Sequence, residues 1–235
     1  MKRIGLLGGM SWESSREYYR LINEGVRDRL GGLHSADLVL TSLDFGPLSE
    51  AMDRRDWPFI EARLEEAARR TVAAGAELLL IGTNTMHKMA PAIERAARPA
   101  LLIHIGDCAA EAARRRGYTR VALMGTRFTM EEDFYSGRLR DAGLTVLLPE
   151  GDDRDWIDRL IFSELCVGVF DESSRRRLAG IVAELRNRGA DAVVLGCTEL
   201  PMLLAPEDSP LPILDTMALH AAAAVSRSLD PAEGL

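Results

Sequence analysis

The chain has 235 residues, of which 47% are hydrophobic and 28% are charged, a composition typical of a globular protein that buries a core. Its net charge of −7 argues against nucleic acid or an anionic membrane as the main partner. No apolar run approaches the ~20 residues of a membrane-spanning helix. The start MKRIGLLGGM lacks the full apolar region and cleavage site of a secretion signal, so we expect a cytoplasmic protein.

Strand-length apolar runs alternate with helical patterns along the whole chain. Several runs are apolar without alternation, which is typical of strands covered on both faces. This order predicts an α/β fold with mostly parallel sheets and helices on both faces. The predicted strands are Arg3–Leu7, Asp37–Ser42, Glu77–Ile81, Ala100–His104, Arg120–Met124, Thr145–Leu148 and Asp191–Leu195. The predicted helices are Trp12–Leu30, Pro58–Ala74, Gly106–Arg116, Thr129–Ala142, Ser173–Arg188 and Thr216–Ser228.

Cysteine and histidine usage argues against disulfides and metal ions. The three cysteines are an odd number without framework spacing, which predicts reduced thiols, and we expect Cys108 and Cys166 to pack as small apolar side chains. None of the four histidines stands at a metal-ligand spacing from another ligand, so we predict no metal site. No lysine lies in a recognisable Schiff-base context and no phosphate-binding motif is present, so we also predict no organic cofactor.

Segments of the first half recur in the second half in the same order. The pairs are Gly75–Thr85 (GAELLLIGTNT) with Gly189–Glu199 (GADAVVLGCTE), Lys2–Gly8 with Thr119–Gly125, and, more loosely, Ser11–Tyr19 with Thr126–Tyr135. Repeats this long indicate a duplicated domain rather than a solenoid. We therefore predict two similar doubly wound halves, residues 1–116 and 117–214, with the C-terminal helix 215–229 returning to the first half and an active site in the cleft between the halves.

Small polar residues follow the predicted strands, and ligands of parallel sheets bind beyond the carboxyl ends of strands. Cys197 follows a buried strand and precedes a helix, whose dipole should lower the thiol pKa from about 8.5. Thr83 occupies the matching position of the repeat, so we interpret the two residues as one reactive group from each half.

Other residues at these turns have two interpretations each. Asn84, Thr85 and Thr198 either hydrogen-bond a ligand or cap helices, and Glu199 either binds an amino group or caps its helix. His87 either polarises the site or is a partly exposed helix histidine.

At GLLGGMSWES, TNTMHK and GCTEL the chain resembles the aspartate/glutamate racemase family, collinearly over essentially its whole length. The resemblance implies enzymes without pyridoxal phosphate, two similar α/β halves with the active site between them, and usually a homodimer. In the usual pattern a cysteine follows the middle strand of each half. One thiol removes the α-proton and the other returns a proton from the opposite face.

The sequence departs from that pattern at the first cysteine position. Cys197 matches the second cysteine, whereas Thr83 stands in place of the first, as in a subset of the family. A hydroxyl is a far weaker acid than a thiol, so Thr83 would relay or donate a proton rather than act as a matched base. Arg54 and Arg55 would suit a side-chain carboxylate, whereas Met10 and Met52 would suit a less acidic side chain. The predicted substrate-binding residues are Met10, Ser11, Met52, Asn84, Thr85, Thr126, Thr198 and Glu199.

Three functions remain open at this point. The first is a cofactor-independent amino-acid racemase acting on aspartate, glutamate or a broader set. The second is a single-cysteine decarboxylase, or another cysteine-dependent enzyme of the same superfamily, acting on a small carboxylate. The third is a non-enzymatic module that closes around a small carboxylate.

Overall fold

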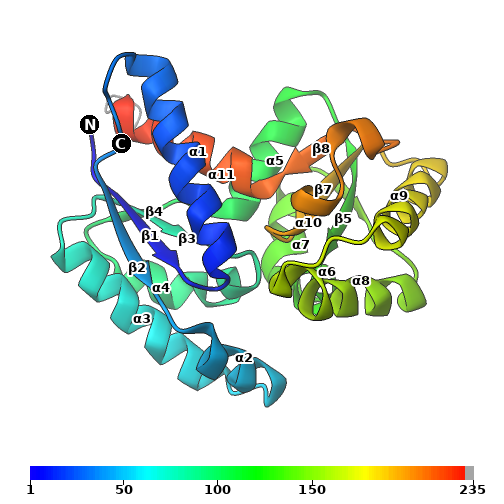
Figure 1. The fold of residues 1–235 in the computed structure, drawn as a ribbon, viewed down its shortest axis with the longest axis horizontal. Coiled ribbons are helices and arrows are strands. Elements are labelled where there is room, and N and C mark those ends of the chain that lie inside the picture. The colour runs from blue at the N-terminus through cyan, green and yellow to red at the C-terminus, as the bar shows by residue number, and fades with distance from the viewer. Residues whose placement is uncertain (231–235) are drawn as a thin grey trace. The chain divides into compact units, whose positions relative to one another are not determined.

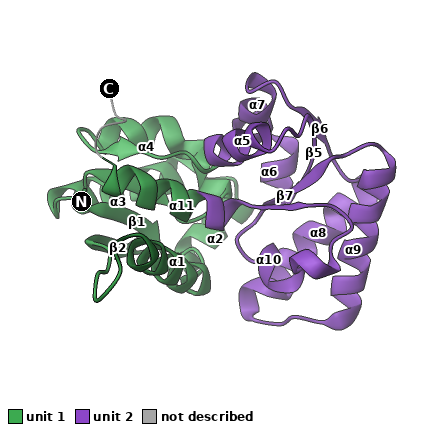
Figure 2. Ribbon diagram, turned by 90° about the horizontal axis from the view of Figure 1, so that it is seen from above, with its two compact units in different colours: residues 1–105, 220–235 green, residues 106–219 purple. Residues whose placement is uncertain are grey.

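The computed structural model describes residues 1–230, which fold into two compact units (Figures 1 and 2). Unit 1 comprises Met1–Ile105 and the chain from His220 on, and unit 2 comprises Gly106–Leu219. Each unit contains a four-stranded parallel sheet, ordered β2-β1-β3-β4 in unit 1 and β6-β5-β7-β8 in unit 2. The prediction of an α/β fold with two similar parallel-sheet halves is therefore confirmed.

The first sheet and its helices come from the N-terminal part of the chain. The elements are β1 (Ile4–Gly8), α1 (Trp12–Leu30), β2 (Leu38–Ser42), α2 (Phe45–Asp53), α3 (Trp57–Ala73), β3 (Leu78–Ile81), the 3₁₀ helix η1 (Thr85–Met89), α4 (Ala90–Ala96) and β4 (Leu101–Leu102). Helices α1 and α3 lie on opposite faces of this sheet (Figures 1 and 2). The all-apolar strand β3 is fully buried because the sheet is covered on both faces.

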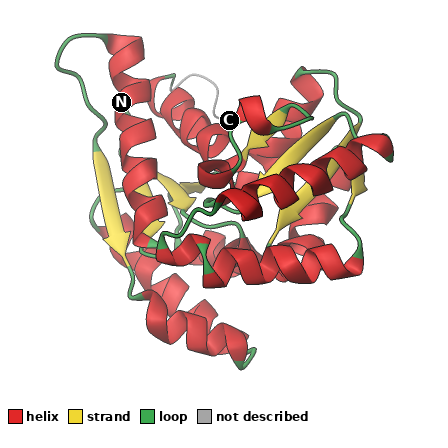
Figure 3. Ribbon diagram, turned by 45° about the vertical axis from the view of Figure 1, so that its right-hand side comes forward, coloured by secondary structure: helices red, strands yellow, loops and turns green. Residues whose placement is uncertain are grey.

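The second sheet repeats this layout with different helices. The elements are α5 (Ile105–Arg115), β5 (Arg120–Gly125), α6 (Arg127–Glu131), α7 (Asp133–Asp141), β6 (Thr145–Leu147), α8 (Gly151–Ser163), η2 (Leu165–Val167), α9 (Glu172–Asn187), β7 (Ala192–Gly196), α10 (Leu200–Leu203), η3 (Pro206–Asp208), β8 (Ile213–Asp215) and α11 (Thr216–Leu229). Helices pack on this sheet too, as the colouring by secondary structure makes visible (Figure 3). Its strands β5 and β7 are buried over nearly their whole length.

The two units exchange their last helices. Helix α5 follows β4 of the first sheet, yet from Gly106 on it belongs to unit 2. Helix α11 follows β8 of the second sheet, yet from His220 on it belongs to unit 1. The N-terminal segment of unit 1 therefore ends at Ile105, and the buried alanines of α5 belong to unit 2.

Glycine follows β3 and ends β7, at two positions where a neighbouring strand lies very close to the backbone. A Cβ on Gly82 would stand 2.9 Å from the Leu7 carbonyl oxygen of β1. A Cβ on Gly196 would stand 3.0 Å from Thr129 and 3.1 Å from the Met124 carbonyl oxygen of β5. These close approaches fix the path of the chain into the turns after β3 and β7.

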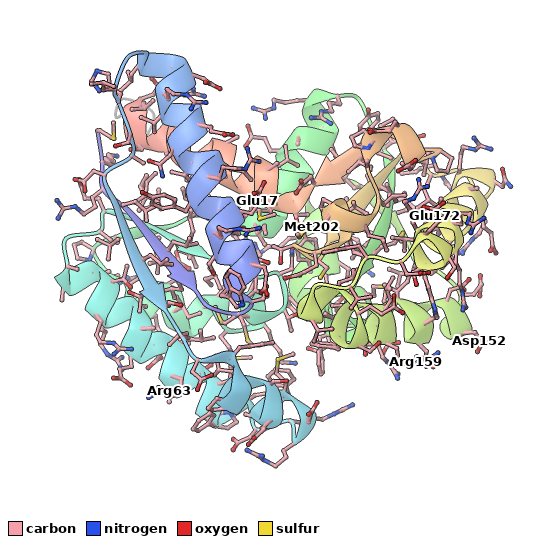
Figure 4. The ribbon with its side chains drawn as sticks, viewed as in Figure 1. Glu17, Arg63, Asp152, Arg159, Glu172 and Met202 are labelled. Atoms are coloured by element: carbon pink, nitrogen blue, oxygen red, sulfur yellow. The ribbon has the colours of Figure 1, made fainter. Side chains whose placement is uncertain are left out.

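Charged side chains cover the outward faces of the helices, as Arg63 on α3 and Asp152 and Arg159 on α8 illustrate (Figure 4). Within residues 1–230, no helix combines the length and apolar character needed to cross a membrane. The same residues contain no cluster of three or more His, Cys, Asp or Glu side chains that could hold a metal ion.

Candidate functional site

In unit 1, two polar turns lie at the same edge of the sheet. Strands β1 and β3 pair in parallel, with Leu7 opposite Ile81. The turn after β1 contains Met10 and Ser11, and the turn after β3 contains Thr83. The carboxyl ends of neighbouring parallel strands therefore bring these two turns of unit 1 together.

Ser11 closes the first of these turns by capping α1. Its side chain accepts a hydrogen bond from the Ser14 amide, and the two hydroxyl oxygens lie 3.2 Å apart. Ser15 accepts from the Gly9 amide at 2.7 Å and donates to the Ser11 carbonyl oxygen at 2.9 Å. The turn is therefore held by its own hydroxyls.

The turn after β3 is held by a histidine. The Nδ1 atom of His87 lies 2.8 Å from the Thr83 carbonyl oxygen, and the His87 amide donates to the Asn84 carbonyl oxygen at 3.1 Å. His87 is buried, so the expectation of a partly exposed helix histidine was wrong. The half-buried Thr83 side chain makes no hydrogen bond to the residues that the structure describes.

In unit 2, the turns after β5 and β7 meet in the same way. These strands pair with Gly125 opposite Gly196. Thr126 caps α6 by accepting from the Thr129 amide, and the two hydroxyl oxygens lie 3.2 Å apart, as Ser11 and Ser14 do in unit 1. The capping geometry of the repeated segments is therefore the same.

Cys197 and Glu199 form a buried pair at the end of β7. The Cys197 thiol donates a hydrogen bond to Glu199 Oε2 at 3.1 Å, and the Thr198 hydroxyl donates to the same oxygen at 2.8 Å. All three side chains are buried, and Cys197 belongs to an apolar cluster against which Cys166 packs. The carboxylate thus faces the thiol of the candidate residue Cys197, an arrangement that the sequence interpretation did not include.

The environment of Cys197 overturns the expected fall in its pKa. Burial, followed by the negative charge of Glu199, raises the pKa of the Cys197 thiol well above its ordinary value. The helix that follows, α10, has only 4 residues and begins at Leu200, so its dipole is too weak to oppose these effects. The resting side chain is therefore a thiol.

The predicted substrate-binding residues are all buried, and all except Met52 of α2 lie in the turns described above. Asn84 and Glu199 are the residues before η1 and α10, but neither side chain makes a capping hydrogen bond, so the helix-cap interpretation was wrong for both. Arg54 is exposed and lies 3.6 Å from Glu50 on α2. The buried members of the predicted set are Met10, Ser11, Met52, Asn84, Thr85, Thr126, Thr198 and Glu199.

A surface hollow of unit 2 lies away from these turns. Charged side chains of α5 and α7 form it, including Asp107, Glu111 and Arg138, and none of the predicted site residues lines it. Arg138 and Asp107 make an exposed ion pair at 2.8 Å. The hollow is a solvated helix face and adds nothing to the candidate site.

The chain is similar to known proteins over nearly its whole length. A family model described as Asp/Glu/Hydantoin racemase matches residues 7–224. The crystal structure of an Asp/Glu racemase candidate from Yersinia pestis is 42% identical, with a TM-score of 0.90 over 98% of this chain and 100% of that chain. An aspartate racemase homologue from Pyrococcus horikoshii OT3 is 29% identical, with a TM-score of 0.84 over 98% and 100%. Picrophilus torridus aspartate racemase, 20% identical, shares the fold with a TM-score of 0.79 over 97% and 94%.

Proposed function

Because this chain belongs to the Asp/Glu/hydantoin racemase family, we propose that it is an amino-acid racemase that inverts the α-carbon of aspartate, glutamate or a related amino acid without an organic cofactor or metal. One observation carries the proposal. A thiol and a carboxylate form a buried hydrogen-bonded pair, Cys197 with Glu199, at the carboxyl end of a parallel strand. Such a pair exchanges a proton without exposing either group to water.

The pair provides the base in two proton transfers. The Cys197 thiol first passes its proton to the Glu199 carboxylate, which becomes a neutral acid, and the sulfur becomes a thiolate. The thiolate then removes the α-proton of the substrate, leaving a carbanion and restoring the thiol. Because the pKa of the thiol is raised, the thiolate is scarce at rest and strongly basic when it forms.

Thr83 supplies the second proton in this proposal. As the residue that matches Cys197 in the repeat, it would donate its hydroxyl hydrogen to the opposite face of the carbanion and regain a hydrogen from water. The proton held by Glu199 then combines with the hydroxide that this step leaves, so the carboxylate, the thiol and the hydroxyl are all restored. A hydroxyl gives up a proton much less readily than a thiol does, so the Thr83 step is the slower one. The L-isomer would lose its α-proton to Cys197, and the D-isomer would lose its α-proton on the Thr83 side.

The carbanion requires hydrogen-bond donors around the substrate carboxylate. We assign this role to Asn84, Thr85, Thr126 and Thr198, together with the amides of their turns. Met10, Ser11, Met52 and Glu199 would complete the substrate contacts. We also propose that the active protein is a homodimer.

Hydrogen exchange in heavy water tests the proposal. Pure L- and D-isomers of aspartate, glutamate and a panel of other amino acids are incubated with the protein. The products are separated by chiral chromatography, and their deuterium content is measured by mass spectrometry. We expect one deuterium at the α-carbon and a shift toward equal amounts of both isomers. Absence of exchange with every amino acid would refute the racemase assignment.

Glu199→Gln tests the proton transfer within the pair. The substitution removes the negative charge that helps to raise the pKa of the Cys197 thiol. The rise of the exchange rate with pH, which follows thiolate formation, should therefore move to lower pH. It also removes the proton acceptor, so the maximal rate should fall by about 100-fold or more. Glu207→Gln, on the short helix η3 outside the site, is the matched control. An unchanged pH profile would exclude Glu199 from the proton transfer.

A second function is favoured by one difference between the halves, namely that only one of the two matched turns carries a thiol. A single thiol suits protonation of an enolate from one face, as after decarboxylation of a substituted malonate. Release of carbon dioxide from such malonates, without deuterium exchange into amino acids, would select this function. Binding of a carboxylate with neither reaction would indicate a non-enzymatic module.

A further inference from the structure

His87 touches the Thr83 turn through two of its atoms. Its Nδ1 atom lies 2.8 Å from the Thr83 carbonyl oxygen. Its main-chain amide donates to the next carbonyl oxygen, that of Asn84, at 3.1 Å. Two successive carbonyl groups of the turn are therefore held by one residue, four positions after Thr83.

The second ring nitrogen of His87 fixes the protonation state. The Ile105 amide donates to Nε2 at 3.2 Å. A main-chain amide can only donate, so Nε2 carries a lone pair, and a carbonyl oxygen can only accept, so Nδ1 carries the hydrogen. His87 is thus a neutral imidazole that joins the turn after β3 to Ile105, the first residue of α5.

Other buried rings of unit 1 hold His87 in this orientation. We call His87, His104, His220 and Tyr18 the histidine cluster. The rings of His104 and His220 lie 4.4 Å and 5.7 Å from the His87 ring, both edge-on. His220 Nε2 lies 2.8 Å from the Ile103 carbonyl oxygen, and its Nδ1 lies 2.9 Å from the Tyr18 hydroxyl.

His220 is also neutral, because it is buried. Burial lowers the pKa of His220 to about 4. Its Nε2 hydrogen therefore goes to Ile103, and its Nδ1 accepts from Tyr18. The hydrogen bonds run from α1 through α11 to the segment Ile103–Ile105, and from there through His87 to the carbonyl group of Thr83.

We propose that His87 is the positioning residue for Thr83. Its neutral imidazole donates from Nδ1 to the Thr83 carbonyl oxygen and thereby sets the direction of the Thr83 hydroxyl. This inference rests on the proposed racemase function. The Thr83 side chain makes no hydrogen bond of its own to the described residues, so its direction depends on the main chain of its turn. A displacement of about 1 Å in a reacting group can cost about 100-fold in rate.

Three substitutions separate positioning from general stability. His87→Leu removes both hydrogen bonds of the ring, whereas His87→Asn keeps a donor near the place of Nδ1. His34→Asn, at an exposed histidine, is the matched control. Deuterium exchange from pure D- and pure L-substrate is measured for each variant, with the melting temperature recorded alongside.

We expect His87→Leu to slow exchange from the D-isomer by about 10- to 100-fold and exchange from the L-isomer by much less. His87→Asn should recover part of the D-isomer rate, and His34→Asn should change neither rate. Equal loss of both rates, tracking the melting temperature, would mean that His87 only stabilises the fold and would overturn the proposal.

The ¹⁵N chemical shifts of the His87 ring in the wild-type protein provide a test that does not depend on folding of a variant. The expected spectrum shows a protonated Nδ1 and an unprotonated Nε2 at neutral pH. A protonated Nε2, in a protein that still exchanges the L-isomer, would overturn the His87 proposal and leave the proposed function intact. Wild-type protein that exchanges neither isomer would instead overturn the proposed function, so the two failures are distinguishable.

Discussion

The turns after β3 and β7 occupy the same place in two sheets of the same strand order, yet they are built from different groups. In unit 1 the Thr83 hydroxyl has no hydrogen-bond partner among the described residues, and a neutral imidazole holds its carbonyl group. In unit 2 the Cys197 thiol donates directly to the buried carboxylate of Glu199.

The two halves therefore share a strand layout but differ in their acid–base groups. Parallel strands and closely packed glycines place a turn at the same edge of both sheets. Among the described residues of these two turns, the second contains the hydrogen-bonded thiol and carboxylate, whereas in our proposals the first depends on the positioning of Thr83 by His87. We therefore expect the two halves to respond differently to substitution and to pH.

The largest expected difference is between Cys197→Ser and Thr83→Ser. Cys197→Ser removes the proposed base and should slow α-hydrogen exchange by about 100- to 10,000-fold. Thr83→Ser keeps a hydroxyl and should have a much smaller effect. Exchange from both isomers is compared, with circular dichroism as the control for folding. Wild-type activity in Cys197→Ser would remove the thiol from the mechanism.

Acid should destabilise the protein through the histidine cluster of unit 1. Burial lowers the pKa of His220 from 6.5 to about 4, so the unfolded chain takes up a proton first as the pH falls. The free energy of unfolding should therefore fall between pH 6.5 and pH 4, by about 3 kcal/mol at 1.36 kcal/mol per unit.

Urea unfolding of wild type and His220→Gln at several pH values checks this expectation, since the variant lacks the titrating ring. The variant should be less stable at pH 7, and its stability should depend less on pH in this range. Parallel curves for the two proteins would contradict the assignment.

Alkali should also destabilise the protein, through the Cys197 thiol of unit 2. Because the folded pKa of Cys197 is raised, its contribution to stability is complete below the unfolded value of about 8.5 and is lost as the pH rises above it. The wild-type protein should lose stability above that pH more steeply than Cys197→Ser does. Equal slopes would indicate an ordinary thiol.

Thr83→Cys should make the two halves more alike. A thiol has a pKa near 8.5, much closer to neutral than that of an alcohol. We expect exchange from the D-isomer to rise about tenfold, the factor that corresponds to 1.4 kcal/mol, and the L and D rates to become more even. The final mixture of isomers must stay equal in both proteins, so initial rates are compared. Unchanged, equal rates would leave Thr83 as a structural residue.

The smallest expected effect concerns two tyrosines in the repeated segments. Tyr18 lies 2.9 Å from His220 Nδ1, whereas the hydroxyl of the fully buried Tyr135 has no hydrogen-bond partner within residues 1–230. Tyr18→Phe should lower the free energy of unfolding by about 1 kcal/mol, and Tyr135→Phe should raise it by about as much. Urea unfolding measures both, and a destabilised Tyr135→Phe would reveal a missing partner.

Most of the fold was predictable because its strands are continuous apolar runs. The runs at β3 and β7 are too short for helices, and glycine follows or ends each. Strand β8 was not predicted because it has only 3 residues and follows a proline-rich stretch. The predicted helix Thr129–Ala142 is interrupted at Glu132, where the backbone is extended and neither glycine nor proline marks the break.

The site was predictable only in part because some of its contacts join distant residues. The repeat placed Thr83 and Cys197 at matching turns. Sequence periodicity could not show that the Glu199 side chain turns toward the thiol, because neighbouring side chains decide that orientation. The histidine cluster left no spacing signal, since its four members come from α1, η1, the segment between β4 and α5, and α11.

The exchange of last helices has a consequence for the autonomy of the halves. In unit 1, Val225 of α11 packs against Gly25, and Ser228 donates to the Lys2 carbonyl oxygen. A fragment ending at residue 116 would lack these contacts and would carry α5, which from Gly106 on belongs to unit 2, without the rest of that unit. We therefore expect that neither half folds alone. A chain of half this length with the same layout would complete its core by exchanging its last helix with a second copy of itself.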